Sequence, residues 1–418
     1  MKKIKIGIFG LGRGMAFAKS IMLCNGDIVA ICDNRPEMVE AAKKQLGDGV
    51  ACYSDFDSFI EHEGMEAVLL ANFFHEHSKY AIRCLERNIH VLSECTAGGT
   101  LADCVALVRA AEKSKAMYML AENYPYMKFN QEMKRICDGG TLGKILFAEG
   151  EYNHPVAPDD FSFIKTYIPT LKHWRNYLPR TYYITHSLAP ITYAVGTFPK
   201  RVTAMPVYDP FDDKEYPYSV KMVQDRSAIV TILNHDDSVF RVTGCAAYGA
   251  HGNSYRICGE RGQIENVRGM GNKVMLRYNA WDVPEGREEI NLYEPSWNDK
   301  DEALIDEAGH GGGDFFVIRN FLDCIREGRQ HPFDVYFATA MSAVAIMAHR
   351  SVLAGGMPYD IPDFRTEEDR VKYENDTASP FWSENGDAPT VECDSHGGTI
   401  RPSETQIENF CRVAGCEK

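Results

Sequence analysis

The sequence predicts an α/β protein in which an N-terminal parallel sheet is followed by a second α/β domain with a large, mainly antiparallel sheet. Three observations predict this fold: apolar runs that alternate with amphipathic segments over the first 120 residues, a glycine-rich turn after the first run, and later β-branched runs without helices between them. A chain of 418 residues is long enough for two or three domains.

The N-terminal domain is expected to contain six strands. Short apolar runs separated by helical patterns are typical of βαβ units, which build a parallel sheet. The helical pattern from Leu101 to Ser114 is one such connection. The expected strands are Ile4 to Phe9, Ile28 to Asp33, Val50 to Tyr53, Ala67 to Ala71, His90 to Ser93 and Met117 to Ala121.

After Asn123 the chain changes to β-branched and aromatic runs separated by turn residues, which favours an antiparallel sheet. Two amphipathic helices, Asp314 to Arg326 and Val335 to Leu353, are expected to cover this sheet or to brace the first domain. From Thr366 onward the chain is polar and weakly periodic, which predicts an extended or partly disordered tail. The expected strands are Ile145 to Tyr152, Ala228 to Leu233, Val239 to Cys245 and Val274 to Tyr278.

The composition argues against several classes of protein. Lys and Arg number 45 against 59 Asp and Glu, and the net charge of −14 without a basic patch predicts no binding to nucleic acid or anionic lipid. No apolar stretch approaches the roughly 20 residues of a membrane span, and the N-terminus leaves no room for a signal peptide, so we expect a cytoplasmic protein. The 13 scattered cysteines contain no Cys-x-x-Cys pair, which predicts reduced thiols.

A dinucleotide site is expected after the first strand. Gly10-Leu11-Gly12-Arg13-Gly14 leads into a helix, although the third glycine of the usual G-x-G-x-x-G pattern comes one residue early. Asp33 ends the second strand, at the distance expected of the carboxylate that binds the adenosine ribose. This carboxylate favours NAD over NADP, a preference that Arg35 would weaken. The alternative is a tight turn with Asp33 as a helix cap. The expected cofactor contacts here are Gly10, Gly12, Arg13, Gly14 and Asp33.

Further cofactor contacts are expected at the ends of later strands, because ligands collect at the carboxyl edge of open parallel sheets. Asn72, His75 and His77 follow the fourth strand. The two histidines would suit a metal loop, but no third ligand adjoins them, so we expect cofactor contact or helix capping and no metal. Glu94 follows the fifth strand and is expected to face the nicotinamide ribose; Asn123 follows the sixth.

These loops resemble those of the Gfo/Idh/MocA superfamily of sugar and inositol oxidoreductases, over roughly residues 3 to 363. The resemblance implies a Rossmann domain followed by an α/β domain whose sheet often mediates oligomerisation. Most members have Glu-Lys-Pro after the fifth strand, and the lysine assists proton transfer at the substrate hydroxyl. Here these positions are Glu94, Cys95 and Thr96, so another group must take the proton.

One branch that also lacks the lysine, the NAD-dependent α-N-acetylgalactosaminidase-like glycosidases, is similar to this chain in three further stretches. They are Glu122 to Tyr126, Tyr183 to Pro190 and His310 to Asp314. The resemblance implies that Tyr126, Tyr183 and His186 are the acid/base residues. His186 is the better base by intrinsic chemistry, since imidazole titrates near neutrality. The alternatives are a capping or core histidine and packing tyrosines.

The expected substrate contacts are donors and an aromatic face gathered between the domains. His173, Trp174 and Arg175 combine hydrogen-bond donors with a ring for stacking on a sugar. The alternative is a surface loop anchored by Trp174. His310 precedes three glycines, so a flexible loop would carry it over the pocket, unless Asp314 merely caps the following helix.

These observations predict residues 1–124 as an NAD-binding Rossmann domain, 125–363 as a substrate-binding and oligomerisation domain, and 364–418 as a polar tail. The resemblance implies a redox-neutral glycosidase: transient oxidation at the sugar C3, elimination, addition of water and re-reduction. The alternatives are an ordinary NAD-dependent sugar or cyclitol dehydrogenase and a non-catalytic dinucleotide-binding protein. An exposed sheet face predicts a homo-oligomer.

Overall fold

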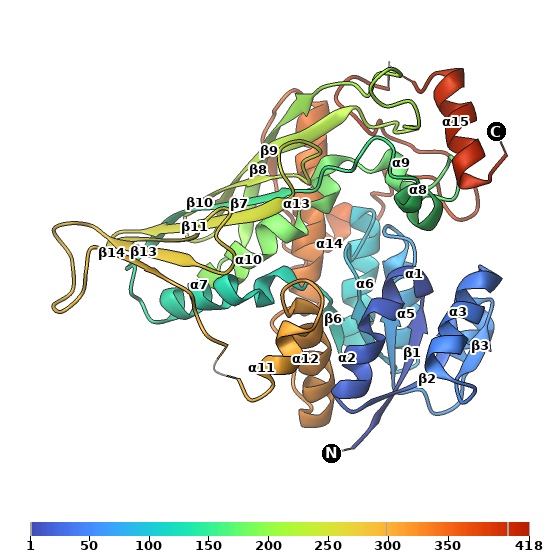
Figure 1. Cartoon of the computed structure of the whole chain (residues 1–418), viewed down its shortest axis with the longest axis horizontal. Coiled ribbons are helices and arrows are strands. Elements are labelled where there is room, and N and C mark those ends of the chain that lie inside the picture. Colours follow the sequence, from blue (N-terminus) through green and yellow to red (C-terminus); the bar gives the residue numbers. More distant parts are fainter. Residues whose placement is uncertain (1, 298, 399–400, 418) are drawn as a thin grey trace. The chain divides into compact units, whose positions relative to one another are not determined.

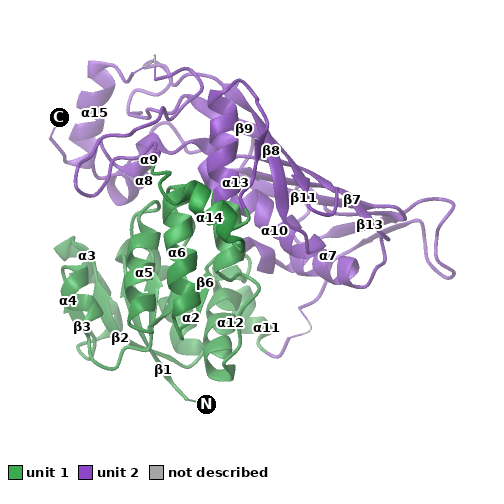
Figure 2. Ribbon diagram, turned by 180° about the vertical axis from the view of Figure 1, so that it is seen from behind, with its two compact units in different colours: residues 1–123, 301–342, 363–377 green, residues 124–300, 343–362, 378–418 purple. Residues whose placement is uncertain are grey.

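The computed structural model describes residues 2–297, 299–398 and 401–417, and they fold as two compact units. Unit 1 comprises residues 1–123, 301–342 and 363–377, and unit 2 comprises 124–300, 343–362 and 378–418 (Figure 2). The chain therefore passes between the units several times, whereas the sequence suggested three consecutive segments. The helix over residues 313–327 belongs to unit 1, so it braces the first domain.

Unit 1 is built on a six-stranded sheet in which all neighbouring strands are parallel, in the order β3-β2-β1-β4-β5-β6 (Figure 1). The strand order reverses between β1 and β4, which is where dinucleotides bind in such sheets. The strands are β1 (Ile4–Phe9), β2 (Gly26–Cys32), β3 (Ala51–Tyr53), β4 (Ala67–Leu70), β5 (His90–Ser93) and β6 (Tyr118–Leu120). The predicted parallel sheet is confirmed.

The helices of unit 1 follow their strands as the periodicity predicts. α6 begins at a capping box in which the Thr100 side chain accepts from the backbone N–H of Asp103 and the Asp103 side chain accepts from that of Thr100. The helical segments of this unit are α1 (Leu11–Gly14), η1 (Met15–Phe17), α2 (Ala18–Leu23), α3 (Pro36–Leu46), α4 (Phe56–Ile60), α5 (His77–Glu86), α6 (Leu101–Lys113), α11 (Glu302–Asp306), α12 (Gly313–Glu327) and α14 (Glu367–Tyr373). α13 (Val335–Leu353) has residues in both units.

Unit 2 contains a nine-stranded sheet in the order β14-β13-β12-β11-β7-β10-β9-β8-β15. Neighbouring strands are antiparallel except β7 and β10, which run parallel. The strands are β7 (Ile145–Asn153), β8 (Pro199–Tyr208), β9 (Asp225–Asn234), β10 (Val239–Thr243), β11 (Gly252–Gly259), β12 (Gly262–Asn266), β13 (Val274–Tyr278), β14 (Ile290–Tyr293) and β15 (Tyr359–Asp360). The expected mainly antiparallel sheet is confirmed.

One face of this sheet packs against two helices, α7 (Lys128–Asp138) and α10 (Thr185–Val195) (Figure 1). The approach of α10 is close: a Cβ added to Gly150 would lie 1.9 Å from the backbone oxygen of Ser187. The remaining helical segments of unit 2 are η2 (Tyr124–Tyr126), α8 (Phe161–Tyr167), α9 (Trp174–Tyr177), η3 (Arg180–Tyr183) and α15 (Glu404–Ala414).

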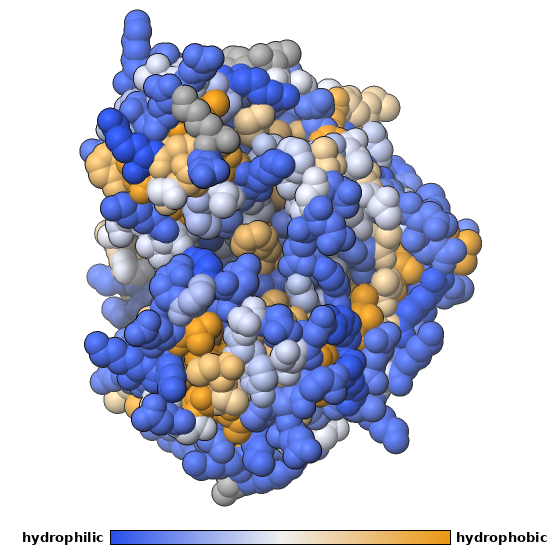
Figure 3. All heavy atoms as spheres, turned by 90° about the vertical axis from the view of Figure 1, so that its right-hand side faces the viewer, coloured by the Kyte–Doolittle hydropathy of each residue, from blue (hydrophilic) through white to orange (hydrophobic). Residues whose placement is uncertain are grey.

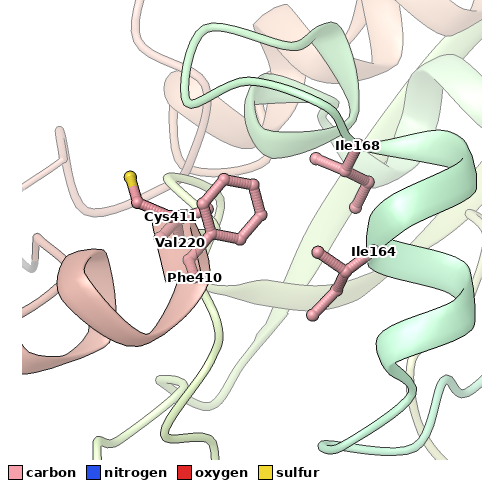
Figure 4. Close-up of a cluster of buried hydrophobic side chains, with 5 residues drawn as sticks. All are labelled: Ile164, Ile168, Val220, Phe410 and Cys411. Atoms are coloured by element: carbon pink, nitrogen blue, oxygen red, sulfur yellow. The ribbon is translucent and has the colours of Figure 1, made fainter. Parts of the chain in front are cut away.

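The C-terminal tail contains two helices, α14 and α15, so the expectation of an extended or partly disordered tail is wrong for these segments. α15 begins at a capping box formed by Ser403 and Gln406. Its Phe410 is buried and packs in a hydrophobic cluster with Ile164 and Ile168 (Figure 4). Burial of this apolar face holds the helix on the domain, although the surrounding sequence is polar.

The face of the molecule in Figure 3 is mainly hydrophilic, with apolar side chains in smaller areas. Among the described residues, no helix combines the length and apolar character required to cross a membrane. The 13 cysteines are free thiols.

Candidate active site

The glycine-rich turn of unit 1 has the geometry of a dinucleotide site. Gly10 has a φ of 88°, and an added Cβ would lie 2.4 Å from the backbone after β4, so only glycine fits. Gly14 packs on β1, where an added Cβ would lie 2.5 Å from a side-chain atom. At Gly12 the nearest atom to an added Cβ is Arg35 Nη2 at 3.4 Å, so the backbone there is open to approach. A pyrophosphate needs this combination of tight turn and accessible backbone.

Asp33 lies beside this turn and is buried. Its Oδ2 accepts a hydrogen bond from the Leu11 N–H at 2.9 Å, and its Oδ1 accepts from the Arg35 backbone N–H at 3.0 Å and from Arg35 Nε at 3.2 Å. The carboxylate therefore fixes the start of the helical segment after β1, and it holds Arg35 over the glycine turn.

Arg13 connects the glycine turn to two distant segments of unit 1. Its Nε donates to Glu94 Oε1 at 2.7 Å, and its Nη2 and Nη1 donate to the two Asp314 oxygens at 2.8 and 3.2 Å. Burial lowers the pKa of Arg13, but the Glu94 and Asp314 carboxylates outweigh it and raise this pKa above its ordinary value. The predicted residue Glu94 is thus held by the predicted residue Arg13.

Asp314 is the centre of this network. Besides Arg13, its carboxylate accepts from Asn123 Nδ2 at 2.8 Å and pairs with His310 Nδ1 at 3.0 Å. Burial raises the pKa of Asp314, but the hydrogen bonds from His310 and Arg13 hold it well below its usual range, so the side chain stays ionised. A Cβ on Gly313 would lie 2.4 Å from the Asn123 backbone oxygen, so this glycine permits the close packing. Asp314 does not cap α12, whose N-cap is Gly312 without a side-chain hydrogen bond, and its carboxylate instead holds this network together.

The loop after β4 holds Asn72, whose side chain lacks partners, and His77, whose Nδ1 is hydrogen-bonded while its Nε2 is buried without a partner among the described residues. Both polar atoms of the Asn72 amide are buried without a hydrogen-bond partner in the described parts of the chain, as expected of a group that binds a ligand. His77 Nδ1 lies 3.0 Å from the Thr96 carbonyl oxygen, and burial lowers its pKa to about 4. His77 is therefore neutral and positions the loop. His75 is also buried, with Nε2 3.3 Å from Glu76.

Two further observations concern metal binding and the position of the motif lysine. Within the described ranges, no cluster of three or more His, Cys, Asp or Glu side chains is suited to a metal ion. Cys95, which replaces the lysine of the motif, is buried with its Sγ 3.2 Å from Glu122 Oε2.

In unit 2, an imidazole lies among phenol rings. The His186 ring stacks on Tyr124 with centroids 4.0 Å apart, and it makes edge contacts with Tyr152 at 5.0 Å and Tyr183 at 5.1 Å. The Tyr255 hydroxyl donates to the His186 carbonyl oxygen at 2.5 Å, which fixes the start of α10. The structure thus brings together the predicted His186 and Tyr183.

Tyr124 and Tyr152 are the members of this cluster that sequence reasoning missed. Tyr124 lies in η2 with the predicted Tyr126, which is also buried. Burial, followed by the nearby Tyr124 and Tyr183 groups, raises the pKa of Tyr152 far above its ordinary value. The Tyr152 phenol therefore stays protonated. The aromatic positions at 124 and 152 were visible in the sequence, but their contact with residue 186 was not.

Three of the four predicted substrate residues lie at α9, and the fourth, His310, is held by Asp314 in unit 1. His173 caps this helix, since its Nδ1 accepts from the Arg175 N–H at 3.3 Å, and both His173 and Trp174 are buried. The Arg175 guanidinium lies 4.4 Å from the Trp174 ring centroid. Trp174 therefore anchors the segment and supports Arg175, which is partly exposed.

Two family models match the chain. The model described as the oxidoreductase family with an NAD-binding Rossmann fold matches residues 4–122. The model described as the glycosyl hydrolase 109 C-terminal domain matches residues 233–370.

Similar proteins agree with these matches. A glycosyl hydrolase family 109 protein of Saccharopolyspora erythraea is 25% identical over 400 residues, which cover 86% of this chain and 83% of that protein. A second one, from Phocaeicola vulgatus, is 24% identical over 406 residues, covering 86% and 84%.

Solved structures share the fold. A levoglucosan dehydrogenase in complex with NADH and levoglucosan superimposes with a TM-score of 0.70 at 17% identity, covering 86% of this chain and all of that one. An oxidoreductase from Agrobacterium radiobacter in complex with NAD+, L-tartaric acid and magnesium gives a TM-score of 0.66 at 16% identity, covering 86% of this chain and 99% of that one.

Proposed function

We propose that this chain, which belongs to the Gfo/Idh/MocA oxidoreductases and carries a glycosyl hydrolase 109 C-terminal domain, is an NAD-dependent glycoside hydrolase. The observation that carries the proposal is that one chain combines two features. Its Rossmann domain lacks the motif lysine, and its unit 2 contains an imidazole set among phenol rings. A redox-neutral cleavage requires several proton-transfer groups rather than the two flanking carboxylates of an ordinary glycosidase.

The residues of unit 1 fit NAD as the cofactor. The glycine turn is tight at Gly10 and open at Gly12, and the Asn72 amide has two buried polar atoms without partners among the described residues. Asn123 Oδ1 is likewise buried and without a partner there. We propose that these groups and Asp33 bind the dinucleotide, with Glu94 near the nicotinamide ribose. The Asp33 carboxylate favours NAD, because it would repel a 2′-phosphate, and its ion pair with Arg35 weakens this preference.

When bound, the nicotinamide would supply reversible hydride transfer at a sugar carbon, which acidifies the neighbouring C–H. The chain's own residues supply the proton transfers and the binding. We assign His186 as the main proton acceptor, since an imidazole is intrinsically a better base than the phenols around it. Tyr183 and Tyr126 are assigned as proton donors, and His173, Trp174, Arg175 and His310 as substrate-binding residues.

The test is a panel of 4-nitrophenyl α- and β-glycosides, with 4-nitrophenolate and NADH recorded together. We expect release of 4-nitrophenolate without net NADH, and loss of turnover when fluorine replaces the hydrogen at C2. His186→Ala should slow turnover by roughly 100- to 10,000-fold, the usual contribution of a general acid or base. NADH formed in proportion to product would identify a sugar or cyclitol dehydrogenase instead. NAD binding without any turnover would indicate a non-catalytic protein.

We also propose a homo-oligomer that pairs through the sheet face opposite α7 and α10. This face carries a hollow lined in part by Glu149, Arg241 and Arg256, where Glu149 forms ion pairs with both arginines. Light scattering of the purified protein would measure the assembly, and a monomer at micromolar concentration would contradict it. The 13 free thiols support a reducing, cytoplasmic location, which cell fractionation would test.

A further inference from the structure

Three cationic side chains of unit 2 gather without an acidic partner. In the described parts of the chain, no carboxylate forms an ion pair with Arg175, Arg180 or Lys221. Two of these side chains donate to backbone oxygens: Lys221 Nζ donates to the Arg175 carbonyl at 2.7 Å, and Arg180 Nε donates to the Asp225 carbonyl at 3.2 Å. All three residues are intermediate between buried and exposed.

The three charges act on one another. Burial lowers the pKa of Lys221 well below its ordinary value, and the charges of Arg180 and Arg175 lower it further. Burial also lowers the pKa of Arg180. Such a cluster is costly for the folded protein, because like charges in a partly buried region repel one another.

The nearby acidic and basic groups do not neutralise the cluster. Asp225 offsets part of the charge of Arg180 without forming an ion pair with it, and its carboxylate accepts hydrogen bonds from the Ser395 N–H at 2.9 Å and hydroxyl at 2.6 Å. A fourth cation, Arg226, pairs with Asp209 at 3.3 Å. The thiol of Cys245 faces the cluster, and burial raises its pKa, so it carries no charge to balance the cations.

The cluster adjoins the imidazole and phenol rings of the same unit. Arg180 begins the 3₁₀ turn that ends at Tyr183, and side chains three residues apart in such a turn lie on the same side. The backbone joins the two groups as well: the Cys245 N–H donates to the Arg180 carbonyl at 3.1 Å, and the Ala246 N–H donates to the Tyr152 carbonyl at 2.9 Å. An anion held by the cations would therefore lie beside the rings to which we assign proton transfer.

We propose that Arg175, Arg180 and Lys221 form an oxyanion subsite, so that the preferred glycosides carry a carboxylate, a sulfate ester or a phosphate ester on the sugar. This inference rests on the proposed function for its substrate class, but the anion site itself does not. Guanidinium groups present paired N–H donors that match such oxyanions, and an ammonium adds a compact charge.

The first experiment measures anion binding without catalysis. The full chain is labelled at pH 8 with limiting acetic anhydride, and acetylation of Lys221 is quantified by mass spectrometry, with exposed Lys214 as the internal control. Inorganic sulfate, phosphate and acetate are compared with chloride at equal ionic strength. We expect at least one of these oxyanions to slow acetylation of Lys221 several-fold while Lys214 is unaffected. Equal acetylation of Lys221 in oxyanion and in chloride solutions would overturn the subsite. Protection of Lys221 by NAD alone that equals the protection by the oxyanions would also overturn it.

The second experiment compares 4-nitrophenyl glycosides with their uronic acid, 6-sulfate and 6-phosphate counterparts. The anionic group that gives the highest kcat/KM identifies the source of the oxyanion. In Arg180→Gln the ratio of kcat/KM for anionic over neutral glycosides should fall roughly 30-fold or more, the effect of removing one partner of a buried charge pair. Arg180→Lys, which keeps the charge, should retain part of this ratio and of the protection. Arg412 is exposed in the last turn of α15, so Arg412→Gln is the control. It should leave the kcat/KM ratio and the protection of Lys221 unchanged.

The two proposals fail in different ways. Preferred turnover of neutral glycosides without anion protection would overturn the subsite and leave the glycosidase proposal intact. Anion protection without turnover of any glycoside would contradict the glycosidase proposal and the substrate class, although the anion site would remain.

Discussion

The charge network of unit 1 makes a quantitative prediction for Asp314→Asn. The amide keeps the shape of the side chain but removes the charge that pairs with Arg13, so the guanidinium retains only Glu94. Removing one partner of a buried ion pair costs about 3 to 5 kcal/mol. Because the Arg13 side chain is 30% exposed while Asp314 is 4% exposed, we expect a smaller loss, about 2 to 4 kcal/mol of the free energy of unfolding.

The matched control lies on the same helix. Asp323 pairs with Arg326 at 2.9 Å, but its side chain is 35% exposed. Asp323→Asn should therefore cost less than about 0.5 kcal/mol. Urea unfolding of the cofactor-free protein, followed by circular dichroism, measures both variants against the original protein.

The pH dependence gives a second, independent measure of the same network. The folded-state pKa of Asp314 is lowered from its ordinary 3.8, so its contribution is complete above that value and is lost as the pH falls toward the folded pKa. The stability difference between the original protein and Asp314→Asn should be constant from pH 7 to about pH 5 and shrink in more acidic solution. Equal losses in Asp314→Asn and Asp323→Asn, or a difference that persists unchanged in acid, would refute the reasoning.

Two further predictions use paired variants. Gly14→Ala places a Cβ 2.5 Å from a β1 side chain and should cost about 1 to 3 kcal/mol of unfolding free energy. Gly12→Ala should fold normally but weaken NAD binding measured by calorimetry. Normal stability of Gly14→Ala would contradict this packing. Phe410→Ala should lower the free energy of unfolding by about 3 to 5 kcal/mol and expose α15 to limited proteolysis. Arg412→Ala should change this free energy by less than about 0.5 kcal/mol. Unchanged proteolysis of Phe410→Ala would show that the hydrophobic cluster does not hold α15.

The sequence predicts those features that arise from neighbouring residues. The strands of unit 1 are continuous apolar runs, and the turn at Gly10 depends on local backbone geometry, so both could be identified directly. The capping box of Ser403 and Gln406 was an equally local signal for α15. The average polarity of the tail masks this single motif.

The parts of the site that could not be predicted depend on contacts between distant residues. Arg13 and Asp314 are 301 positions apart in the chain, and only the fold brings them together. Arg180 and Lys221 look like surface charges in the sequence, because most lysines and arginines are solvated or paired. What distinguishes them is that neither forms an ion pair with a carboxylate among the described residues, a property that a sequence does not carry.

The charge distribution limits how an anionic substrate would be recognised. The chain carries a net charge of −14, so its long-range field repels anions, and attraction at Arg180 and Lys221 must act at short range. Salt separates these two effects, because the screening length falls from about 30 Å at 0.01 M to about 10 Å at 0.1 M. Moderate salt thus removes the repulsion first and weakens partly buried contacts less. Recognition of an oxyanion by this cluster should consequently survive an increase in ionic strength that would abolish attraction by an exposed basic surface.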